Sequence, residues 1–167
     1  PLVGMMDQAP ILTITLNPAL DISTSAARVV PDVKLRCETP SFDPGGGGIN
    51  VSRAIRNMGG HSAALVALGG TTGQRMADML DAAGISLITL PAPGETRQSL
   101  TADDRATRQQ YRFVMPGPNW SENDVDRALA LAVSAAPKGA LVVLSGSNPP
   151  GVPPAFAAML AERLRGH

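Results

Sequence analysis

The chain has 167 residues, with 14 basic and 14 acidic side chains and a formal net charge of zero. At roughly 150 residues per domain, this length indicates about one domain. The balanced charge gives no electrostatic argument for nucleic acid or an anionic membrane as a partner, and it leaves little repulsion to oppose self-association. Hydrophobic residues make up 44% of the chain, which is enough for a globular core.

Few residues are available for disulfides, metal binding or membrane insertion. The single cysteine, Cys37, excludes an intrachain disulfide framework, and His61 and His167 lie too far apart in the sequence to indicate a metal centre. No apolar run approaches the roughly 18 residues that a transmembrane helix needs. Residues 1–10, which we expect to form a tail, lack the basic and apolar regions of a secretory signal, so we expect a cytoplasmic protein.

Strand-like patterns begin directly after this tail. Residues 11–16 alternate apolar side chains with Thr, which is typical of a strand, and Asn17-Pro18 ends the segment. Residues 22–43 are β-prone but interrupted by prolines, so we expect short hairpin-like strands at the edge of a sheet. Two further predicted strands are continuous apolar runs, 63–68 and 141–144, and another is 85–90. Two more, 96–101 and 109–115, lie around a polar turn.

Helical patterns lie between these strands. The first predicted helix follows Gly45–Gly48, the third begins at the N-cap residue Ser121, and the last opens at Pro153-Pro154. The alternation of strands and helices predicts an α/β fold with a mainly parallel sheet, with residues 22–43 and about 95–115 covering one edge. The apolar stripes expected to face the core are Val51, Ala54, Ile55 and Met58; Met76, Met79, Leu80 and Ala83; Val125, Leu129 and Val133; and Phe156, Met159, Leu160 and Leu164.

Four consecutive glycines, Gly45–Gly48, directly precede the first predicted helix. Because glycine has no Cβ, its backbone can approach a ligand closely, and the free N–H groups of a helix start favour an anion or hydroxyl oxygens. The alternative is a flexible loop before an ordinary helix, but the position of the glycines next to the helix favours a ligand site. No Gly-Lys-Ser/Thr follows, as a P-loop requires, and Asn50 replaces the third glycine of the dinucleotide fingerprint.

Polar residues follow two of the predicted strands, where ligands bind in open α/β sheets. Asp21 could accept hydrogen bonds from sugar hydroxyls, although the residues alone favour a turn-forming role. Asn50 is equally compatible with an N-cap and with a ligand contact. Ser147 and Asn148 follow strand 141–144 and could bind phosphate or shape the turn before two prolines.

Basic side chains in the predicted edge strands are candidates for phosphate binding. Arg97 lies in strand 96–101 and Arg112 in the facing strand, and guanidinium groups form bidentate contacts with phosphate oxygens. Lys34 and Arg36 lie in the first hairpin-like segment. Taken singly, each is better explained as a solvated charge on an edge strand.

Several motifs together resemble the PfkB branch of the ribokinase-like carbohydrate kinases, and most closely its minor, ribokinase-type 6-phosphofructokinases of bacteria. The motifs recur in the order of that family and cover almost the whole chain from about Ile11 onward. They are Asn17-Pro18-Ala19-Leu20-Asp21, Lys34-Leu35-Arg36-Cys37, Pro44-Gly45-Gly46-Gly47-Gly48-Ile49-Asn50-Val51-Ser52-Arg53-Ala54-Ile55, Thr96-Arg97-Gln98, Tyr111-Arg112-Phe113-Val114-Met115-Pro116-Gly117 and Ser145-Gly146-Ser147-Asn148-Pro149-Pro150-Gly151.

The resemblance implies a three-layer α/β/α domain with a small β lid, through which family members often dimerise. It also implies transfer of the γ-phosphoryl group of ATP to a hydroxyl of a sugar phosphate, with Mg²⁺. The residues that it places at the substrate are Asp21 for the sugar hydroxyls; Gly46, Gly47 and Asn50 for holding the sugar; Arg97 and Ser147 for the sugar or its phosphate; Lys34, reaching across the dimer; and Arg112 as a further phosphate candidate.

Gly47 is the position that bears on the acceptor. Relatives that phosphorylate fructose 1-phosphate or tagatose 6-phosphate commonly carry Lys there, so the resemblance favours fructose 6-phosphate, with those two kinases as alternatives. The family's Gly-Ala-Gly-Asp motif, which supplies the general-base Asp, and its magnesium-associated Asn-x-x-Glu segment do not occur in this chain. We therefore expect the N-terminal part of a kinase domain over residues 11–167, with no catalytic or metal-binding residue, negligible turnover by the isolated chain and an unpaired apolar edge at 141–144. A catalytically inactive sugar-phosphate-binding fragment is the further alternative.

Overall fold

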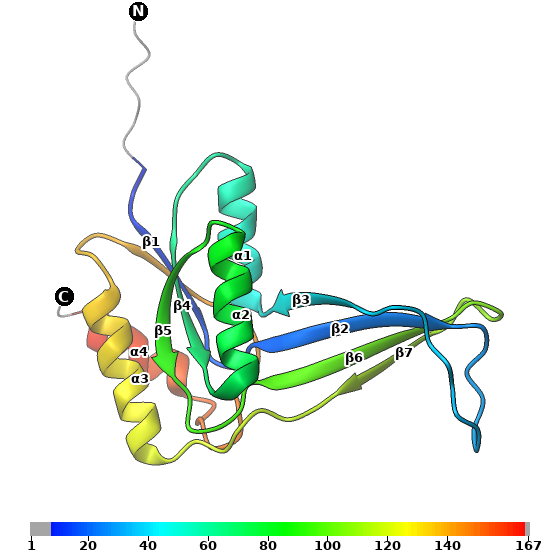
Figure 1. The fold of residues 1–167 in the computed structure, drawn as a ribbon. Coiled ribbons are helices and arrows are strands. Elements are labelled where there is room, and N and C mark those ends of the chain that lie inside the picture. The colour runs from blue at the N-terminus through cyan, green and yellow to red at the C-terminus, as the bar shows by residue number, and fades with distance from the viewer. Residues whose placement is uncertain (1–7, 166–167) are drawn as a thin grey trace, which may run out of the picture.

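Two sheets organise the chain in the computed structural model, which describes residues 8–165 (Figure 1). The core sheet has the strand order β5-β4-β1-β8, and all its pairs are parallel. The mainly parallel sheet predicted from the continuous apolar runs is therefore confirmed. Its strands are β1 (Ile11–Thr15), β4 (Ala63–Leu68), β5 (Ser86–Pro91) and β8 (Leu141–Leu144).

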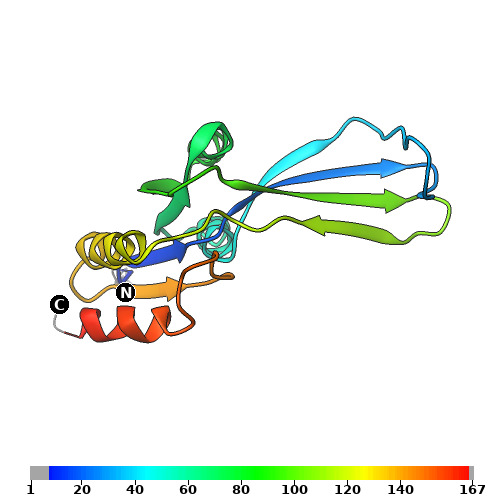
Figure 2. The same cartoon turned by 90° about the horizontal axis from the view of Figure 1, so that it is seen from below.

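Helices cover both faces of the core sheet and complete three layers (Figure 2). Alternate residues of β4 point to opposite sides: Leu65 packs in one hydrophobic cluster with Leu129 and Phe156, and Val66 packs in the other with Met76. The α/β/α architecture follows from these two clusters, because a strand buried on both faces needs a helical layer on each. The helices are α1 (Gly47–Asn57) and α2 (Gly70–Ala82) on one face, and α3 (Glu122–Ala135) and α4 (Phe156–Leu164) on the other.

The second sheet, here called the lid sheet, extends away from the core (Figures 1 and 2). Its strand order is β3-β2-β6-β7, and it is mixed, because β2 pairs in parallel with β6 but antiparallel with β3. In the segment that joins β2 to β3, the strand pairing consists of one isolated bridge, from Ala26 to Cys37. The strands are β2 (Ala19–Ala26), β3 (Ser41–Gly45), β6 (Arg97–Asp104) and β7 (Gln110–Val114).

The apolar stripe predicted for the first helix is wrong. Helix α1 buries Gly48, Ile49 and Ser52 against the sheet, whereas Met58 is 78% exposed. The reason is a buried hydroxyl pair, since Ser52 Oγ lies 2.7 Å from Thr13 Oγ1 on β1. A small, hydrogen-bonded face brings the helix close to the strand, and apolar periodicity carries no signal of such a face.

Two smaller predictions also need correction. Asp21 does not lie in a turn, because its backbone belongs to β2, between β3 and β6. Helix α4 begins at Phe156 instead of at the two prolines; Pro153 supplies the carbonyl that accepts a hydrogen bond from the Phe156 N–H. In both places tertiary pairing or a turn overrides the local signal.

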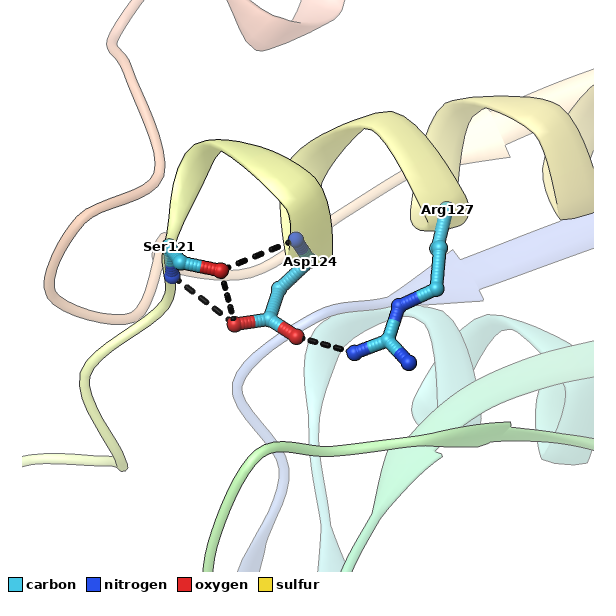
Figure 3. Close-up of polar contacts among 3 residues, drawn as sticks. All are labelled: Ser121, Asp124 and Arg127. Atoms are coloured by element: carbon cyan, nitrogen blue, oxygen red, sulfur yellow. Dashed lines mark hydrogen bonds and ion pairs between the residues drawn. The ribbon is translucent and has the colours of Figure 1, made fainter.

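The predicted start of the third helix is confirmed by a capping box (Figure 3). Ser121 Oγ accepts a hydrogen bond from the Asp124 N–H at 3.2 Å, and the Ser121 N–H donates to Asp124 Oδ2 at 2.8 Å. Arg127 also donates to the Asp124 carboxylate. The hydrogen bonds that the Asp124 carboxylate accepts lower its pKa. The largest cause is the bond donated by the Ser121 hydroxyl, followed by the bond from the Ser121 N–H.

Two further features are the edge of the core sheet and the ends of the described region. Strand β8 is an edge strand of the core sheet, as expected, and Leu141 is 60% exposed. The tail expected at 1–10 and His167 lie largely outside the described residues; within them, Gln8 exchanges hydrogen bonds of 2.5 and 2.9 Å with the backbone of His61. No helix among residues 8–165 combines the length and apolar character needed to cross a membrane.

Candidate functional site

The glycine run lies where the carboxyl ends of β1 and β8 meet the start of α1. A Cβ on Gly47 would lie 2.4 Å from Ser145 Oγ and 2.7 Å from the Gly146 nitrogen, and one on Gly48 would lie 2.7 Å from the Ile14 carbonyl oxygen. Real Cβ atoms do not approach other atoms so closely. The glycines are therefore required by the close packing of α1 on two strand ends, besides any contact with a ligand.

The first turn of α1 does not present all its N–H groups to a ligand. The Gly48 N–H donates to the Ser145 carbonyl at 3.2 Å, and the Ile49 N–H donates to Thr15 Oγ1 at 3.1 Å. The expectation of free amides is thus wrong for these two residues, because the ends of β1 and β8 occupy them. The adjoining Gly46 has φ 151°, a backbone conformation that side-chain-bearing residues rarely adopt.

A cavity of about 510 Å³ opens beside these glycines, on one face of the lid sheet. Side chains at odd positions of β2 and β6 point into it, because successive residues of a strand face opposite sides. Four of the predicted substrate residues line it: Asp21, Gly46, Arg97 and Arg112. Ser23, Ser99 and Thr101 add hydroxyl groups to the lining, which also includes the apolar residues Ala19, Leu100 and Val114.

Asp21 places a half-buried carboxylate in this cavity. Burial is the largest cause that raises its pKa, and the neighbouring Asp43 raises it further, whereas Arg97, Arg112 and Arg53 oppose the shift. No hydrogen bond contributes to this pKa shift, so no donor among residues 8–165 occupies the carboxylate oxygens. A Cβ on Gly45 would lie 2.1 Å from Asp21 Oδ2, which shows how closely the glycine backbone covers this group. The site therefore holds an acceptor suited to ligand hydroxyls.

Two guanidinium groups of different character face Asp21. Arg97 is fixed by backbone carbonyls: Nη2 donates to the Asn17 oxygen at 3.0 Å, and Nη1 donates to the Met115 oxygen at 3.1 Å. Burial lowers the pKa of Arg97, while Asp21 acts against that shift. Arg112 is exposed on β7. Arg97 thus connects the core to the lid sheet as well as facing the cavity, whereas Arg112 is the more exposed cation.

The remaining predicted residues lie outside the cavity lining. Gly47 contacts the β8–α4 loop, and Ser147 in that loop accepts a hydrogen bond from Asn17 Nδ2 at 3.0 Å. Asn50 is exposed in the first turn of α1, and Lys34 is exposed in the segment between β2 and β3. The structure therefore unites four of the eight residues around one cavity and leaves Gly47, Ser147, Asn50 and Lys34 beside it or away from it.

Three residues at this site escaped the sequence analysis. Asn17 ended a predicted strand and opened a family motif but was given no role at the site, yet it contacts both Arg97 and Ser147. Asp43 and Arg53 form an ion pair of 2.8 Å between β3 and α1. Their spacing of ten residues across the glycine run carries no local signal, because the pairing depends on the turn that Gly45–Gly48 make.

Metal-ligating side chains are dispersed in the part of the chain that the structure describes. No group of three or more His, Cys, Asp or Glu side chains within residues 8–165 could hold a metal ion. The acidic groups nearest the cavity, Asp21 and Asp43, face arginines, and Asp43 is paired with Arg53. The cavity therefore combines a carboxylate acceptor with guanidinium donors.

The parallel core sheet, the β lid and a polar cavity at the glycine run define a sugar-kinase type of fold and site. The chain belongs to the pfkB family of carbohydrate kinases, whose family model matches residues 12–167. It is 44% identical over 155 residues to the ATP-dependent 6-phosphofructokinase isozyme 2 of Mycobacterium tuberculosis, which covers 93% of this chain and 46% of that protein. The isozyme 2 of Escherichia coli K12 is also 44% identical, over 142 residues, covering 85% of this chain and 46% of the relative.

Solved structures give the same assignment. Phosphofructokinase-2 from Escherichia coli in complex with fructose-6-phosphate superposes with a TM-score of 0.87 at 38% identity, covering 95% of this chain and 52% of that one. A possible 1-phosphofructokinase from Thermotoga maritima has a TM-score of 0.82 at 31% identity, covering 94% and 51%. The three-layer ribokinase-like fold with a β lid is therefore confirmed, and the chain spans about half the length of the relatives it matches.

Proposed function

We propose that this chain forms the sugar-phosphate-binding part of an ATP-dependent kinase whose acceptor is fructose 6-phosphate and whose product is fructose 1,6-bisphosphate. The observation that carries the proposal is the Asp21 carboxylate, half-buried and without a protein hydrogen bond, facing Arg97 and Arg112 across one cavity. A carboxylate accepts hydrogen bonds from sugar hydroxyls, and guanidinium groups bind phosphate oxygens. One polar cavity thus offers both halves of a sugar phosphate a partner.

The proposed division of roles follows the family resemblance. Asp21 binds the sugar hydroxyls, and the backbone of Gly46 and Gly47 with the Asn50 amide holds the sugar ring from the side of α1. Arg97 and Ser147 contact the sugar or its phosphate, and Arg112 is a further phosphate contact. Lys34 lies in the exposed segment between β2 and β3 and would reach the phosphate of a neighbouring subunit.

Transfer of a phosphoryl group needs positioning, a base for the attacking hydroxyl and charge neutralisation by metal and donors. The described residues contribute to the first requirement, since Asp21 and the glycine backbone hold and orient the acceptor. We propose that ATP is the donor, as in the curated relatives, and that the base and the Mg²⁺ ligands are not among the residues of this chain. The isolated chain should accordingly bind the acceptor and turn over negligibly.

The acceptor assignment is supported by Gly47. A side chain at this position would have to displace the backbone of Gly146 as well as Ser145, so the β8–α4 loop lies against α1 only because residue 47 has no Cβ. A lysine at this point would shift the loop that carries Ser147. Fructose 1-phosphate and tagatose 6-phosphate remain the acceptors to be compared, because one structural relative is a possible 1-phosphofructokinase.

We also propose that the lid sheet forms a homodimer interface in a cytoplasmic enzyme. Five apolar residues of the lid and its connections are between 39% and 62% exposed, which is unusual for a solvated surface. A second copy of the lid would cover them and bring its Lys34 toward the cavity. These residues are Val33, Leu35, Phe113, Val114 and Met115.

Calorimetric titration of the chain with fructose 6-phosphate tests the proposed function. We expect binding of fructose 6-phosphate, weaker binding of fructose 1-phosphate, and loss of binding in Asp21→Asn, because an amide accepts fewer hydrogen bonds from hydroxyls than a carboxylate. Asp32→Asn, in the exposed loop after β2, is the matched control and should bind like the wild type. Equal affinity of the wild type and Asp21→Asn for fructose 6-phosphate would contradict the proposal.

A further inference from the structure

Asn17 connects two of the residues to which a substrate contact is assigned. Its backbone carbonyl accepts hydrogen bonds from Arg97 Nε at 3.3 Å and from Arg97 Nη2 at 3.0 Å. Its side-chain Nδ2 donates to Ser147 Oγ at 3.0 Å. Arg97 belongs to the lid sheet and Ser147 to the β8–α4 loop, so one residue at the end of β1 fixes both relative to the core.

The hydrogen bond to Ser147 determines where the serine hydroxyl can act. A serine hydroxyl has one proton to donate and lone pairs that accept. Because Asn17 Nδ2 occupies Ser147 Oγ as an acceptor, the hydroxyl proton is free to point elsewhere. Ser147 itself is exposed, so that proton is available to an acceptor outside the protein, such as a phosphate or hydroxyl oxygen of a ligand.

The Oδ1 atom of the Asn17 side chain shows that this residue is not needed for packing alone. Asn17 is 9% exposed, and its Oδ1 has no hydrogen-bond partner among the described residues. This oxygen lies against Gly117, where a Cβ would approach it to 2.3 Å. A buried acceptor without a partner costs about 1–3 kcal/mol, so an apolar side chain of this size would serve stability better. The amide therefore has a role through its Nδ2 atom, which donates to Ser147.

We propose that Asn17 is a positioning residue, which holds the Ser147 hydroxyl as a donor toward the bound sugar phosphate and anchors Arg97 through its backbone carbonyl. This inference rests on the proposed function, since it presupposes a sugar phosphate beside Ser147. In this role Asn17 acts without touching the ligand itself. The effect of its side chain on binding passes through Ser147, and that of its carbonyl passes through Arg97.

A double-mutant cycle on binding tests the inference. The affinity for fructose 6-phosphate is measured by calorimetry for the wild type, Asn17→Ala, Ser147→Ala and the double variant. We expect each single variant to bind about tenfold more weakly, the order of one lost hydrogen bond to a charged ligand. The double variant should bind no more weakly than Ser147→Ala, because the Asn17 side chain has no effect once the hydroxyl is gone.

Controls separate positioning from damage to the fold. Asn57→Ala removes an exposed amide at the end of α1, outside the cavity lining, and it should bind like the wild type. Asn17→Asp keeps the size of the side chain but can only accept from Ser147, which turns the hydroxyl proton away from the ligand. It should bind fructose 6-phosphate at least about tenfold more weakly, and it replaces Asn17→Ala in the cycle if the alanine variant does not fold.

The outcomes distinguish a failure of the positioning role of Asn17 from a failure of the proposed function. Wild-type affinity in Asn17→Ala or Asn17→Asp, or effects that multiply in the double variant, would overturn the positioning role and leave the proposed function intact. If the folded wild type binds no sugar phosphate, the proposed function of this chain and the inference both fail. Non-additive loss together with wild-type binding by Asn57→Ala supports the inference.

Discussion

Asp21 and Asp43 stand directly opposite each other on the antiparallel strands β2 and β3. Like charges in such a pair destabilise each other, and the chain offsets the repulsion with Arg53, which binds Asp43 through two hydrogen bonds of 2.8 and 3.0 Å. Arg53 belongs to α1, so the ion pair also joins the lid sheet to the helix that follows the glycine run. The ionisation of Asp21 thus depends on a pair of residues that sequence reasoning had not selected.

The first prediction concerns the pKa of Asp21. Asp43→Asn removes the second-largest cause of the upward shift, so the pKa of Asp21 should fall toward its ordinary value, whereas Arg53→Ala should raise it. A ¹³C NMR titration of the aspartate carboxyl groups measures both changes without any ligand. Asp103→Asn, on β6 and away from Asp21, is the control. An unchanged Asp21 pKa in both variants would contradict the electrostatic coupling.

The second prediction is a stability change with pH in Asp21→Asn. Because the folded-state pKa of Asp21 is raised above the unfolded value, the folded state binds this proton more tightly, and stability is lost as pH rises through the two values. Asparagine cannot ionise, so the variant should be more stable than the wild type at neutral pH and should lose that advantage in acid. Urea unfolding at several pH values measures the difference. A variant less stable than the wild type at neutral pH would show that packing dominates.

The third prediction addresses the capping box of α3. Ser121→Ala should reduce the free energy of unfolding by about 1 kcal/mol, since it removes the acceptor for the Asp124 N–H. Ser134→Ala, on the exposed side of the same helix, is the control and should change stability little. Because hydrogen bonds lower the pKa of Asp124, their contribution is present above the unfolded pKa and lost as pH falls through the folded one. The deficit of Ser121→Ala should therefore shrink in strong acid.

The contrast between α3 and α1 shows what the sequence could predict. The start of α3 depends on two residues three positions apart, so Ser121 and Asp124 carry the whole signal locally. The buried face of α1 depends on Ser52 meeting Thr13, 39 residues away, and no apolar pattern records it. Local chemistry and continuous apolar runs were enough for the sheets and helices, but not for the orientation of α1.

The residues of the candidate site also differ in whether the sequence could predict them. Asp21, Gly46, Arg97 and Arg112 could be selected through the family motifs, although residue type alone favoured a turn for Asp21 and solvated charges for the arginines. The fold brings all four to one cavity. Asn17 could not be selected for its contacts, because its hydrogen bonds join residues 80 and 130 positions away. Residues that touch a ligand have chemical signatures, whereas residues that position them are found only from tertiary contacts.

The fourth prediction tests why the glycine run is required. Gly48→Ala places a Cβ 2.6 Å from Thr15 Oγ1 and 2.7 Å from the Ile14 carbonyl oxygen, so α1 must move off β1. We expect a loss of about 1–3 kcal/mol in unfolding free energy, the usual cost of overpacking. Asn57→Ala, at the exposed end of the same helix, should be neutral or slightly stabilising. Wild-type stability of Gly48→Ala would show that the glycine serves flexibility instead of close packing.

The fifth prediction separates the two arginines of the cavity. Arg97 holds the Asn17 and Met115 carbonyls, so Arg97→Ala should loosen the connection between core and lid sheet, besides weakening the binding of fructose 6-phosphate. Arg112→Ala should weaken binding only, because its guanidinium is exposed. Hydrogen exchange of the β2, β6 and β7 amides measures the first effect and should rise at least about tenfold in Arg97→Ala, as expected when local opening becomes easier by 1.4 kcal/mol. Equal amide exchange in the two variants would contradict the role of Arg97 in joining the core to the lid sheet. Normal binding of fructose 6-phosphate by both variants would contradict the assignment of phosphate binding to these two arginines.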